Sequence, residues 1–263
     1  MHANEREVLI LTLLSERGFV SFRDLEKRIA GSPATIRRDL ERLAQEQRLT
    51  RVRGGIKANG TVAAQPNALA SALHLAGVPF HENIARNTPE KQAIGKAAAA
   101  FCTPGEGVMI DGGSTTLQMC PHLAGLNLQV LTNSLHIVSA LINQNGTRIL
   151  VPSGAVFPEQ NIILSVFGDD GMPRFHAPKL FMGAASIGPA GLMQADIVLV
   201  AGERRLIERA DEIIVLVDAT KFDGPSGNVV CGLEEIDTII TDDRVSDVTA
   251  NMLDRAGVML VVA

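Results

Sequence analysis

The chain has 263 residues, 46% of them hydrophobic and 20% charged, so it can form one large or two smaller domains and is too apolar for large-scale disorder. It contains no Trp or Tyr and only nine Phe, which predicts an aliphatic core. The net charge is −5, but residues 1–60 carry about +4 and the remainder about −9, which favours a basic module joined to an acidic one.

Three short helices are predicted at the N-terminus. Apolar residues recur at helical spacing within 5–16 and again within 22–30, and a glycine follows each segment. A third helix is predicted over 33–47, with Ser32 as its N-cap and a proline at its first position. The basic segment 49–58, "LTRVRGGIKA", is typical of a short hairpin. Three helices followed by such a hairpin predict a winged helix-turn-helix.

The domain organisation follows from the change of pattern along the chain. We expect a winged helix-turn-helix at 1–58, a small and polar linker at 59–80, and a second domain at 81–263. In the second domain, predicted helices alternate with apolar strands, which indicates an α/β fold with a mostly parallel sheet covered on both faces. Strands are expected at 107–111, 128–133, 148–154, 212–220, 237–243 and 258–263, and helices at 90–102, 114–124, 134–144, 202–210 and 248–257.

The third helix carries the residues expected to contact DNA. Its basic side chains lie off the apolar stripe, and residues near the start of such a helix reach base edges in the major groove. Arginines of the hairpin are expected to hold phosphates, which positions a protein without reading sequence. The alternative is an ordinary solvated basic helix. The expected DNA-binding residues are Ser32, Thr35, Arg37, Arg38, Arg42, Arg51, Arg53 and Lys57.

A second site is predicted from turns that follow strands. "IDGGSTTLQ" at 110–118 has paired glycines that let backbone N–H groups approach a ligand, and it opens a helix whose N-terminus favours phosphate. A Thr-Asn-Ser segment follows the next strand, and a lysine lies past a later strand end. The alternative is a set of ordinary turns. The residues expected to bind an effector are Asp111, Gly112, Gly113, Ser114, Thr115, Thr116, Thr132, Asn133, Ser134 and Lys221.

The segment "SPATIRRDLERLAQEQRLTRVRGG" at 32–55 closely resembles the N-terminal motif of the DeoR family of bacterial sugar-metabolism repressors, and the resemblance continues through "EKQAIGKAAA", "DGGSTT", "LTNSL" and "VDATKF". It implies a repressor of a sugar or carbohydrate-derivative catabolic operon that is released by a phosphorylated, sugar-like effector. The expected partners are double-stranded operator DNA, the effector, and further copies of the chain in a dimer or tetramer.

The sensing domain of that family also resembles ribose-5-phosphate isomerase, which raises an alternative function as a sugar-phosphate isomerase-like enzyme. The resemblance adds Gly154, Gly183 and Glu203 to the expected effector site, Glu203 at the position of the isomerase's catalytic base. Residues 182–186 stand where the isomerase has two aspartates, and both are missing here. We therefore expect a retained pocket without catalysis.

Other motifs carry little chemistry. Three widely spaced cysteines argue against a disulfide framework and fit a reducing cytoplasm. Six histidines show no metal-binding spacing, so neither a metal nor a cofactor is expected. No segment approaches the roughly 20 apolar residues that span a bilayer, so no membrane partner is expected. The acidic pairs Asp169-Asp170 and Asp242-Asp243 are expected to be solvated loop charges.

Overall fold

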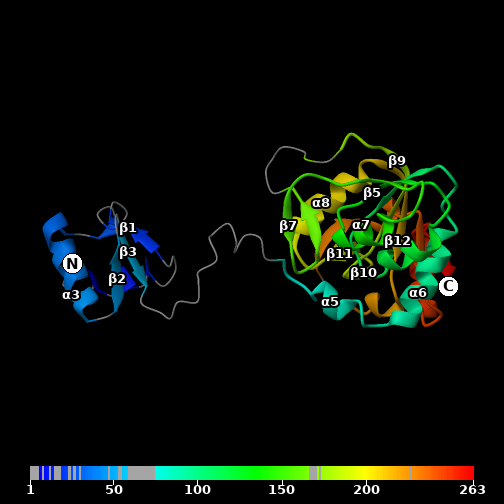
Figure 1. Ribbon diagram of the computed structural model, residues 1–263. Helices are drawn as coiled ribbons and strands as arrows, with labels where there is room; N and C mark the ends of the chain where they lie inside the picture. Colours follow the sequence, from blue (N-terminus) through cyan, green and yellow to red (C-terminus); the bar gives the residue numbers. More distant parts are fainter. Residues whose placement is uncertain are drawn as a thin grey trace. The chain divides into compact units, whose positions relative to one another are not determined.

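The computed structural model divides into two compact units, Met1–Asn67 and Ala68–Ala263 (Figure 1). It describes residues 6–7, 9–11, 13–14, 19–22, 25, 28–29, 31–46, 48–52, 55–58, 75–165, 171, 173–224 and 227–263. Most of the predicted linker and the pair Asp169-Asp170 lie outside these residues. Each unit is described by itself.

The first unit combines helical segments with a small sheet. The predicted third helix is α3 (Pro33–Gln45), which ends two residues earlier than the sequence predicts. The predicted hairpin is present as β2 (Leu49–Val52) and β3 (Gly55–Ala58), paired antiparallel. Strand β1 (Phe19–Ser21), which the sequence did not predict, pairs with the other side of β3 and gives the order β1-β3-β2.

One aliphatic cluster holds this unit together. It contains the predicted stripe of α3 together with leucines and isoleucines of both earlier helical segments and of the sheet. The stripe residues Ile36, Leu40 and Leu43 are at most 3% exposed, as their spacing of four and three predicts. Helix α3 therefore turns its other side, with the arginine pair, away from the core.

The second unit is built on a parallel sheet of seven strands in the order β15-β14-β12-β9-β4-β5-β6. This confirms the predicted α/β class. The strands are β4 (Gly107–Ile110), β5 (Gln129–Leu131), β6 (Arg148–Leu150), β9 (Ala177–Met182), β12 (Ala210–Leu216), β14 (Thr238–Thr241) and β15 (Met259–Val262).

Both faces of this sheet are covered, and the alternation of side chains along β9 shows how. Leu180 and Met182 belong to one apolar cluster, and Phe181 between them belongs to the other. The Phe181 face is covered by α6 (Thr88–Ala99), the 3₁₀ segment η1 (Thr116–His122) and α7 (Leu135–Leu141). The opposite face is covered by α8 (Ile197–Ile207), α9 (Asp247–Arg255) and a small antiparallel sheet.

Several elements depart from the sequence-based expectation. The helix predicted over 114–124 is a 3₁₀ segment that contains Pro121, which cannot continue an α-helix. Two further sheets were not predicted from the sequence. They are the pair β7 (Ala155–Phe157) and β8 (Ile162–Leu164), and the triple β10 (Ser186–Gly188), β11 (Gly191–Gln194) and β13 (Asn228–Cys231).

Residues 75–80, which the sequence analysis placed in the linker, pack on the second unit. Leu75 is 8% exposed and lies in a cluster with Phe157, Ile162 and Leu164. The short helix α5 (Phe80–Asn83) follows directly. The sequence did not indicate this packing, because the segment consists mostly of small residues. Only Leu75 and Phe80 anchor it.

The prediction of two solvated aspartates at 242–243 is wrong for the first of them. Asp242 is 3% exposed, accepts the backbone N–H of Ala219 at 2.8 Å and pairs with Arg244 at 2.7 Å. Asp243 is exposed. The three cysteines are free and buried. No helix among the described residues is both long and apolar enough to cross a membrane.

Candidate functional site

The start of α3 is fixed by its cap. The Ser32 hydroxyl accepts the backbone N–H of Thr35 at 3.2 Å and lies 2.9 Å from the Thr35 hydroxyl. Pro33 occupies the first helical position, where no N–H is needed. Ser32 and Thr35, both predicted DNA-binding residues, therefore also stabilise the end of the helix that carries the arginines.

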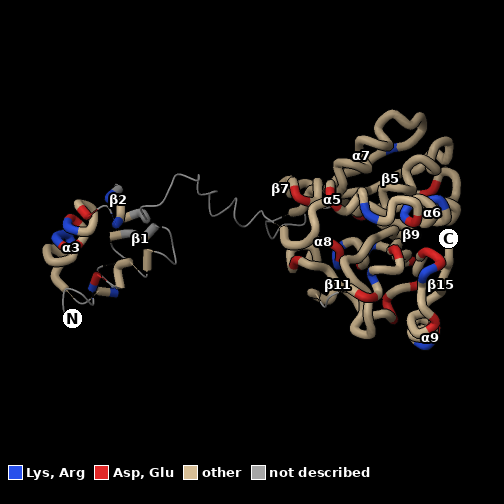
Figure 2. The backbone as a smooth tube through the Cα atoms, turned by 90° about the horizontal axis from the view of Figure 1, so that it is seen from below, with Lys and Arg blue, Asp and Glu red and all other residues tan. Residues whose placement is uncertain are grey.

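The arginines of α3 differ in how they are held. Arg37 lies over the Phe22 ring at 5.0 Å, and Arg42 pairs with Glu7 at 2.6 Å and with Glu46 at 3.0 Å. Arg38 is exposed and has no hydrogen bond or ion pair with any described residue. Basic and acidic positions alternate along α3 in Figure 2. Arg38 is therefore the arginine of this helix most available to an outside partner.

The hairpin contributes one described cation. Arg51 on β2 is exposed and pairs with Glu41 of α3 at 2.8 Å, a surface contact that a phosphate can replace at little cost. Arg53 and the side chain of Lys57, also predicted to bind DNA, lie outside what the structure describes.

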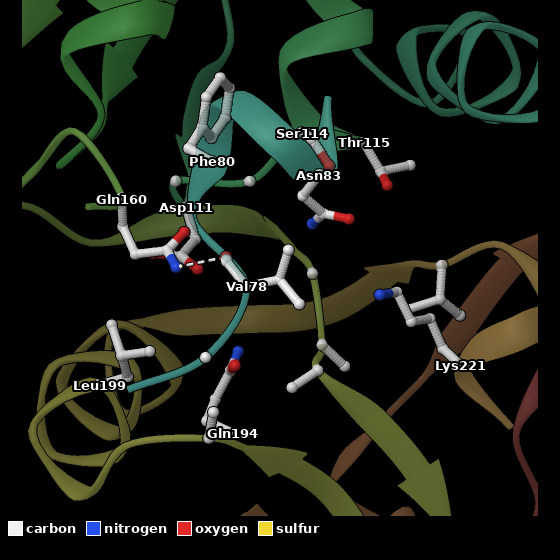
Figure 3. A pocket seen from close by; sticks show the side chains of 18 of the residues that line it. Val78, Phe80, Asn83, Asp111, Ser114, Thr115, Gln160, Gln194, Leu199 and Lys221 are labelled. Carbon is white, nitrogen blue, oxygen red and sulfur yellow. Dashed lines mark hydrogen bonds between the residues drawn. The ribbon is translucent and has the colours of Figure 1, made fainter. Parts of the chain in front are cut away.

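A cavity of about 380 Å³ lies in the second unit, within the size range of small-molecule sites. It opens at the carboxyl ends of β5, β4, β9 and β12, which are neighbours in the sheet, because the turns after these strands contribute to its wall. Figure 3 shows the side chains that converge on it. The predicted residues that line it are Asp111, Gly112, Gly113, Ser114, Thr115, Asn133, Gly183, Glu203 and Lys221.

The turns after β4 and β5 are joined by one amide side chain. Asn133 donates to the Asp111 carboxylate at 2.8 Å and accepts the backbone N–H of Gly112 at 2.8 Å. A Cβ on Gly112 would stand 2.5 Å from Cγ2 of Ile162, so only glycine fits this approach. The two predicted motifs therefore form a single cradle.

The remaining predicted effector residues support this cradle or lie apart from it. The Thr116 hydroxyl donates to the Asp111 carbonyl at 2.8 Å. Thr132 accepts the backbone N–H of Ser134 at 3.1 Å, and Ser134 caps α7. Gly154 is exposed, and none of these four lines the cavity.

Lys221 is the cation of the predicted set that reaches the cavity. It is carried by the 3₁₀ turn η2 (Ala219–Lys221), which Asp218 caps and Asp242 holds at its first residue. Its side chain extends into the cavity in Figure 3, and its ammonium has no hydrogen bond or ion pair with any described residue. An anion in the cavity would supply that partner.

Two further cations stand near Lys221, and the sequence analysis missed both. Arg86 lines the cavity, and Lys91 lies behind it, 1% exposed, donating to the carbonyl of Asn83 at 2.5 Å. Burial is the main cause that lowers the pKa of Lys91 to about 8. Asp218 acts in the opposite direction, and the charges of Lys221 and Arg86 lower this pKa further. This side of the cavity thus holds positive charges that repel one another.

Two buried carboxyl groups form another part of the wall. Asp111 and Glu203 are each 4% exposed. Burial raises the pKa of Asp111 to about 6, against the Asn133 hydrogen bond. Burial also raises the pKa of Glu203 well above its usual value, and the charge of Asp111 adds to this. Gln194 donates to one Glu203 oxygen at 2.7 Å, and the other has no hydrogen-bond partner.

The segment 75–86, which we call the pocket strap, closes one side of the cavity. Ala76 donates its N–H to Asp196 at 2.9 Å, and Gln160 donates to the carbonyl of Val78 at 2.9 Å (Figure 3). The Phe80 ring stacks on His136 with centroids 4.2 Å apart. The cavity-lining members of the strap are Ala76, Gly77, Val78, Phe80, Asn83 and Arg86. The sequence analysis did not predict that this segment lines the cavity, because its small residues form no motif.

Together these groups suit recognition of an anion that also carries hydroxyl groups. Unpaired lysine, backbone N–H groups and hydroxyls favour a phosphate, whereas buried carboxyl oxygens and Gln194 favour hydroxyls. Among the described residues no three His, Cys, Asp or Glu side chains are grouped so that they could hold a metal ion.

Family models match both units. A model described as the DeoR-like helix-turn-helix domain matches residues 6–62, and one described as the DeoR C terminal sensor domain matches residues 86–243. Curated relatives from Shigella dysenteriae serotype 1 (strain Sd197) and Escherichia coli (strain K12 / DH10B) are both named HTH-type transcriptional regulator UlaR. Each is 28% identical over 257 residues, 98% of this chain and 98% of the relative.

Solved structures give more distant similarities. Ribose 5-phosphate isomerase A of Methanocaldococcus jannaschii is 15% identical with a TM-score of 0.37, covering 52% of this chain and 55% of that one. Subunit eIF2B delta of Chaetomium thermophilum is 17% identical with a TM-score of 0.39, covering 53% of this chain and 50% of that one.

Proposed function

The chain belongs to the DeoR family of helix-turn-helix transcriptional regulators, and on that premise we propose that it represses a sugar or carbohydrate-derivative catabolic operon until a phosphorylated effector releases it. Residues 1–58 read operator DNA, and the second unit senses the effector. Relatives that match over 98% of the chain are named transcriptional regulators, which supports this assignment.

The capped start of α3 carries the DNA half of the proposal. Arg38, near that start, is exposed and has no ion pair with any described residue, and an arginine there can bond guanine O6 and N7, with about 1–3 kcal/mol of discrimination per good pair. Arg37 and Arg51 lie on the same unit and add contacts to bases or phosphates.

A gel-shift titration of the full chain on DNA upstream of its own gene tests this half. Arg38→Ala should weaken binding to the specific site by about 1–3 kcal/mol and leave binding to unrelated DNA nearly unchanged. Arg174→Ala, which removes an exposed arginine of the second unit, is the matched control and should bind normally. Absence of any retardation at low salt would contradict the assignment.

The Lys221 ammonium, which has no partner among the described residues, carries the effector half. With Arg86 and the turn residues Gly113, Ser114 and Thr115 it forms the phosphate end of the cavity. Lys221→Met should abolish release of DNA by a sugar phosphate while leaving DNA affinity without effector unchanged. Normal release by this variant would show that the phosphate binds elsewhere.

We propose that the pocket strap transmits occupancy of the cavity to the DNA-binding unit. The strap lines the cavity, and the chain leads from it through residues 59–74 to the first unit. A ligand that contacts Val78 and Asn83 changes how firmly this segment is held, and it shifts DNA binding by its differential affinity for the two arrangements.

Gln160→Ala tests the strap, because it removes a hydrogen bond to the Val78 carbonyl and leaves the phosphate end intact. We expect the variant to bind the effector but to release DNA less completely at saturation. Hydrogen exchange should show stronger protection of residues 75–86 when the wild-type chain binds effector. Unchanged protection would contradict this role.

Self-association is proposed as well, as a dimer or tetramer. Strand β15 is a sheet edge with exposed Met259 and Val262, and the adjacent helix α9 carries exposed Val248. Two copies would place two recognition helices on half-sites about 34–36 Å apart. Sedimentation of the wild-type chain and of Val248→Glu tests this surface, and a monomeric wild type would exclude it.

An isomerase-like activity is not favoured. The isomerase resemblance places aspartates at Met182 and Ala185, and Ala185 lines the cavity without an acidic group, so the acid–base constellation is incomplete. The full chain should show no turnover of aldose phosphates at effector-saturating concentrations.

A further inference from the structure

The cavity has two ends of opposite chemical character. At one end Lys221 and Arg86 line the wall, with Lys91 behind them. At the other end Asp111 and Glu203 line it. In Figure 3 the Lys221 side chain enters the cavity across from Asp111 and Leu199. A ligand that fills the cavity meets cations at one end and carboxyl groups at the other.

The carboxyl end is not neutralised by the protein. Neither Asp111 nor Glu203 forms an ion pair with a described lysine or arginine, and their hydrogen-bond donors are the neutral amides of Asn133 and Gln194. Burial is the main cause that raises the pKa of Glu203, and the charge of Asp111 raises it further. A further negative charge at this end is therefore unfavourable.

This end can accept hydrogen bonds that it does not yet receive. The second carboxyl oxygen of Glu203 is buried and has no hydrogen-bond partner among the described residues, which is costly for a polar atom. A ligand hydroxyl can donate to a carboxylate or exchange donor and acceptor roles with a carboxylic acid. A ligand carboxylate or phosphate brings a further negative charge and no donor, so it is repelled.

We propose that the cavity selects a singly phosphorylated, hydroxyl-rich ligand whose far end is uncharged, and that the Asp111–Glu203 pair rejects ligands with a carboxylate or second phosphate at that end. The inference rests on the proposed function, because the Lys221 end has to take the phosphate. Glu203, held by Gln194, thereby acts in ligand selection.

Calorimetric titration of the full chain with three six-carbon probes tests the selection. Glucitol 6-phosphate and 6-phosphogluconate differ only in the group at carbon 1, a hydroxymethyl or a carboxylate, and glucitol 1,6-bisphosphate adds a second phosphate there. We expect glucitol 6-phosphate to bind at least about tenfold more tightly than either of the others, a difference of about 1.4 kcal/mol. This comparison needs no variant.

The double variant Asp111→Asn/Glu203→Gln removes both carboxyl groups with little change of shape. In this variant the preference for glucitol 6-phosphate over the other two probes should fall below about threefold. Circular dichroism checks that the variant folds. Equal affinity of the wild-type chain for the hydroxymethyl and carboxylate probes would overturn the inference, and so would an unchanged preference in a folded double variant.

Inorganic phosphate separates this inference from the function on which it rests. If inorganic phosphate binds and Lys221→Met abolishes that binding, but none of the six-carbon probes binds, the phosphate end stands and the selection proposed here is wrong. If neither inorganic phosphate nor any probe binds the wild-type chain, the proposed effector site itself falls.

Discussion

Replacing Gly112 by alanine should destabilise the second unit and loosen the contact between the turns that follow β4 and β5. The new Cβ would lie 2.5 Å from Cγ2 of Ile162 and 3.1 Å from Oδ1 of Asn133. Carbon atoms pack best at about 3.5–4.0 Å, so the turn or β8 has to move by about 1 Å. Overpacking of this kind costs about 1–3 kcal/mol, and loss of the Gly112–Asn133 hydrogen bond adds about 1 kcal/mol.

Reduced freedom of the unfolded chain offsets about 0.4–1 kcal/mol of this, which leaves a net loss of roughly 2 kcal/mol. For a unit of this size that corresponds to a decrease in Tm of about 4–8 °C. Thermal unfolding followed by circular dichroism measures it, and sugar-phosphate binding should weaken in parallel.

Gly183→Ala is the matched control. Gly183 also lines the cavity, but the nearest atom to its added Cβ is the Leu216 carbonyl oxygen at 4.0 Å. This variant should unfold at nearly the wild-type temperature. Equal Tm values for Gly112→Ala and the wild type, or an equal loss in both variants, would refute the close-packing argument.

Four other changes have expected outcomes. Ser32→Ala should cost the first unit about 1 kcal/mol, seen as faster hydrogen exchange at the start of α3. Arg51→Ala should reduce the slope of log affinity for DNA against log salt concentration by about 1, if it holds a phosphate. Because the folded-state pKa of Asp111 is raised from 3.8 to about 6, wild-type stability should fall relative to Asp111→Asn as pH rises from about 4 to 6, measured by denaturant titration. Because the folded-state pKa of Lys91 is lowered from 10.5 to about 8, wild-type stability should rise relative to Lys91→Met between about pH 8 and 10.5.

Periodicity and chain order predicted most of the fold correctly. Residues 33–47 had a helical stripe with a capping serine and proline, and the structure places α3 at Pro33–Gln45. Alternating apolar segments from residue 90 onward indicated the parallel sheet, because buried strands and amphipathic helices leave strong local patterns. The sequence analysis missed β7, β8 and β10, which belong to small sheets outside the alternating series of strands and helices.

The candidate functional sites were likewise predicted only in part. Turns after strands were predicted to meet, since the ends of neighbouring parallel strands lie at one sheet edge. The structure brings Asp111, Asn133, Gly183 and Lys221 to one cavity, although it leaves Gly154 outside. Asp242 was misjudged because burial depends on what packs above a loop, which a local pattern of charges does not reveal.

By itself, the sequence determined the order of the main helices and strands, which arginines leave the α3 core, and which glycine and hydroxyl turns follow the strands. These features depend on neighbours in the chain. Only the tertiary structure decided that Lys91 and Arg86 join Lys221, that Asp111 and Glu203 share one buried end, and that the pocket strap closes the cavity. Such groups are distant in sequence, and their charges and pKa values take their meaning from burial and from partners that folding brings together.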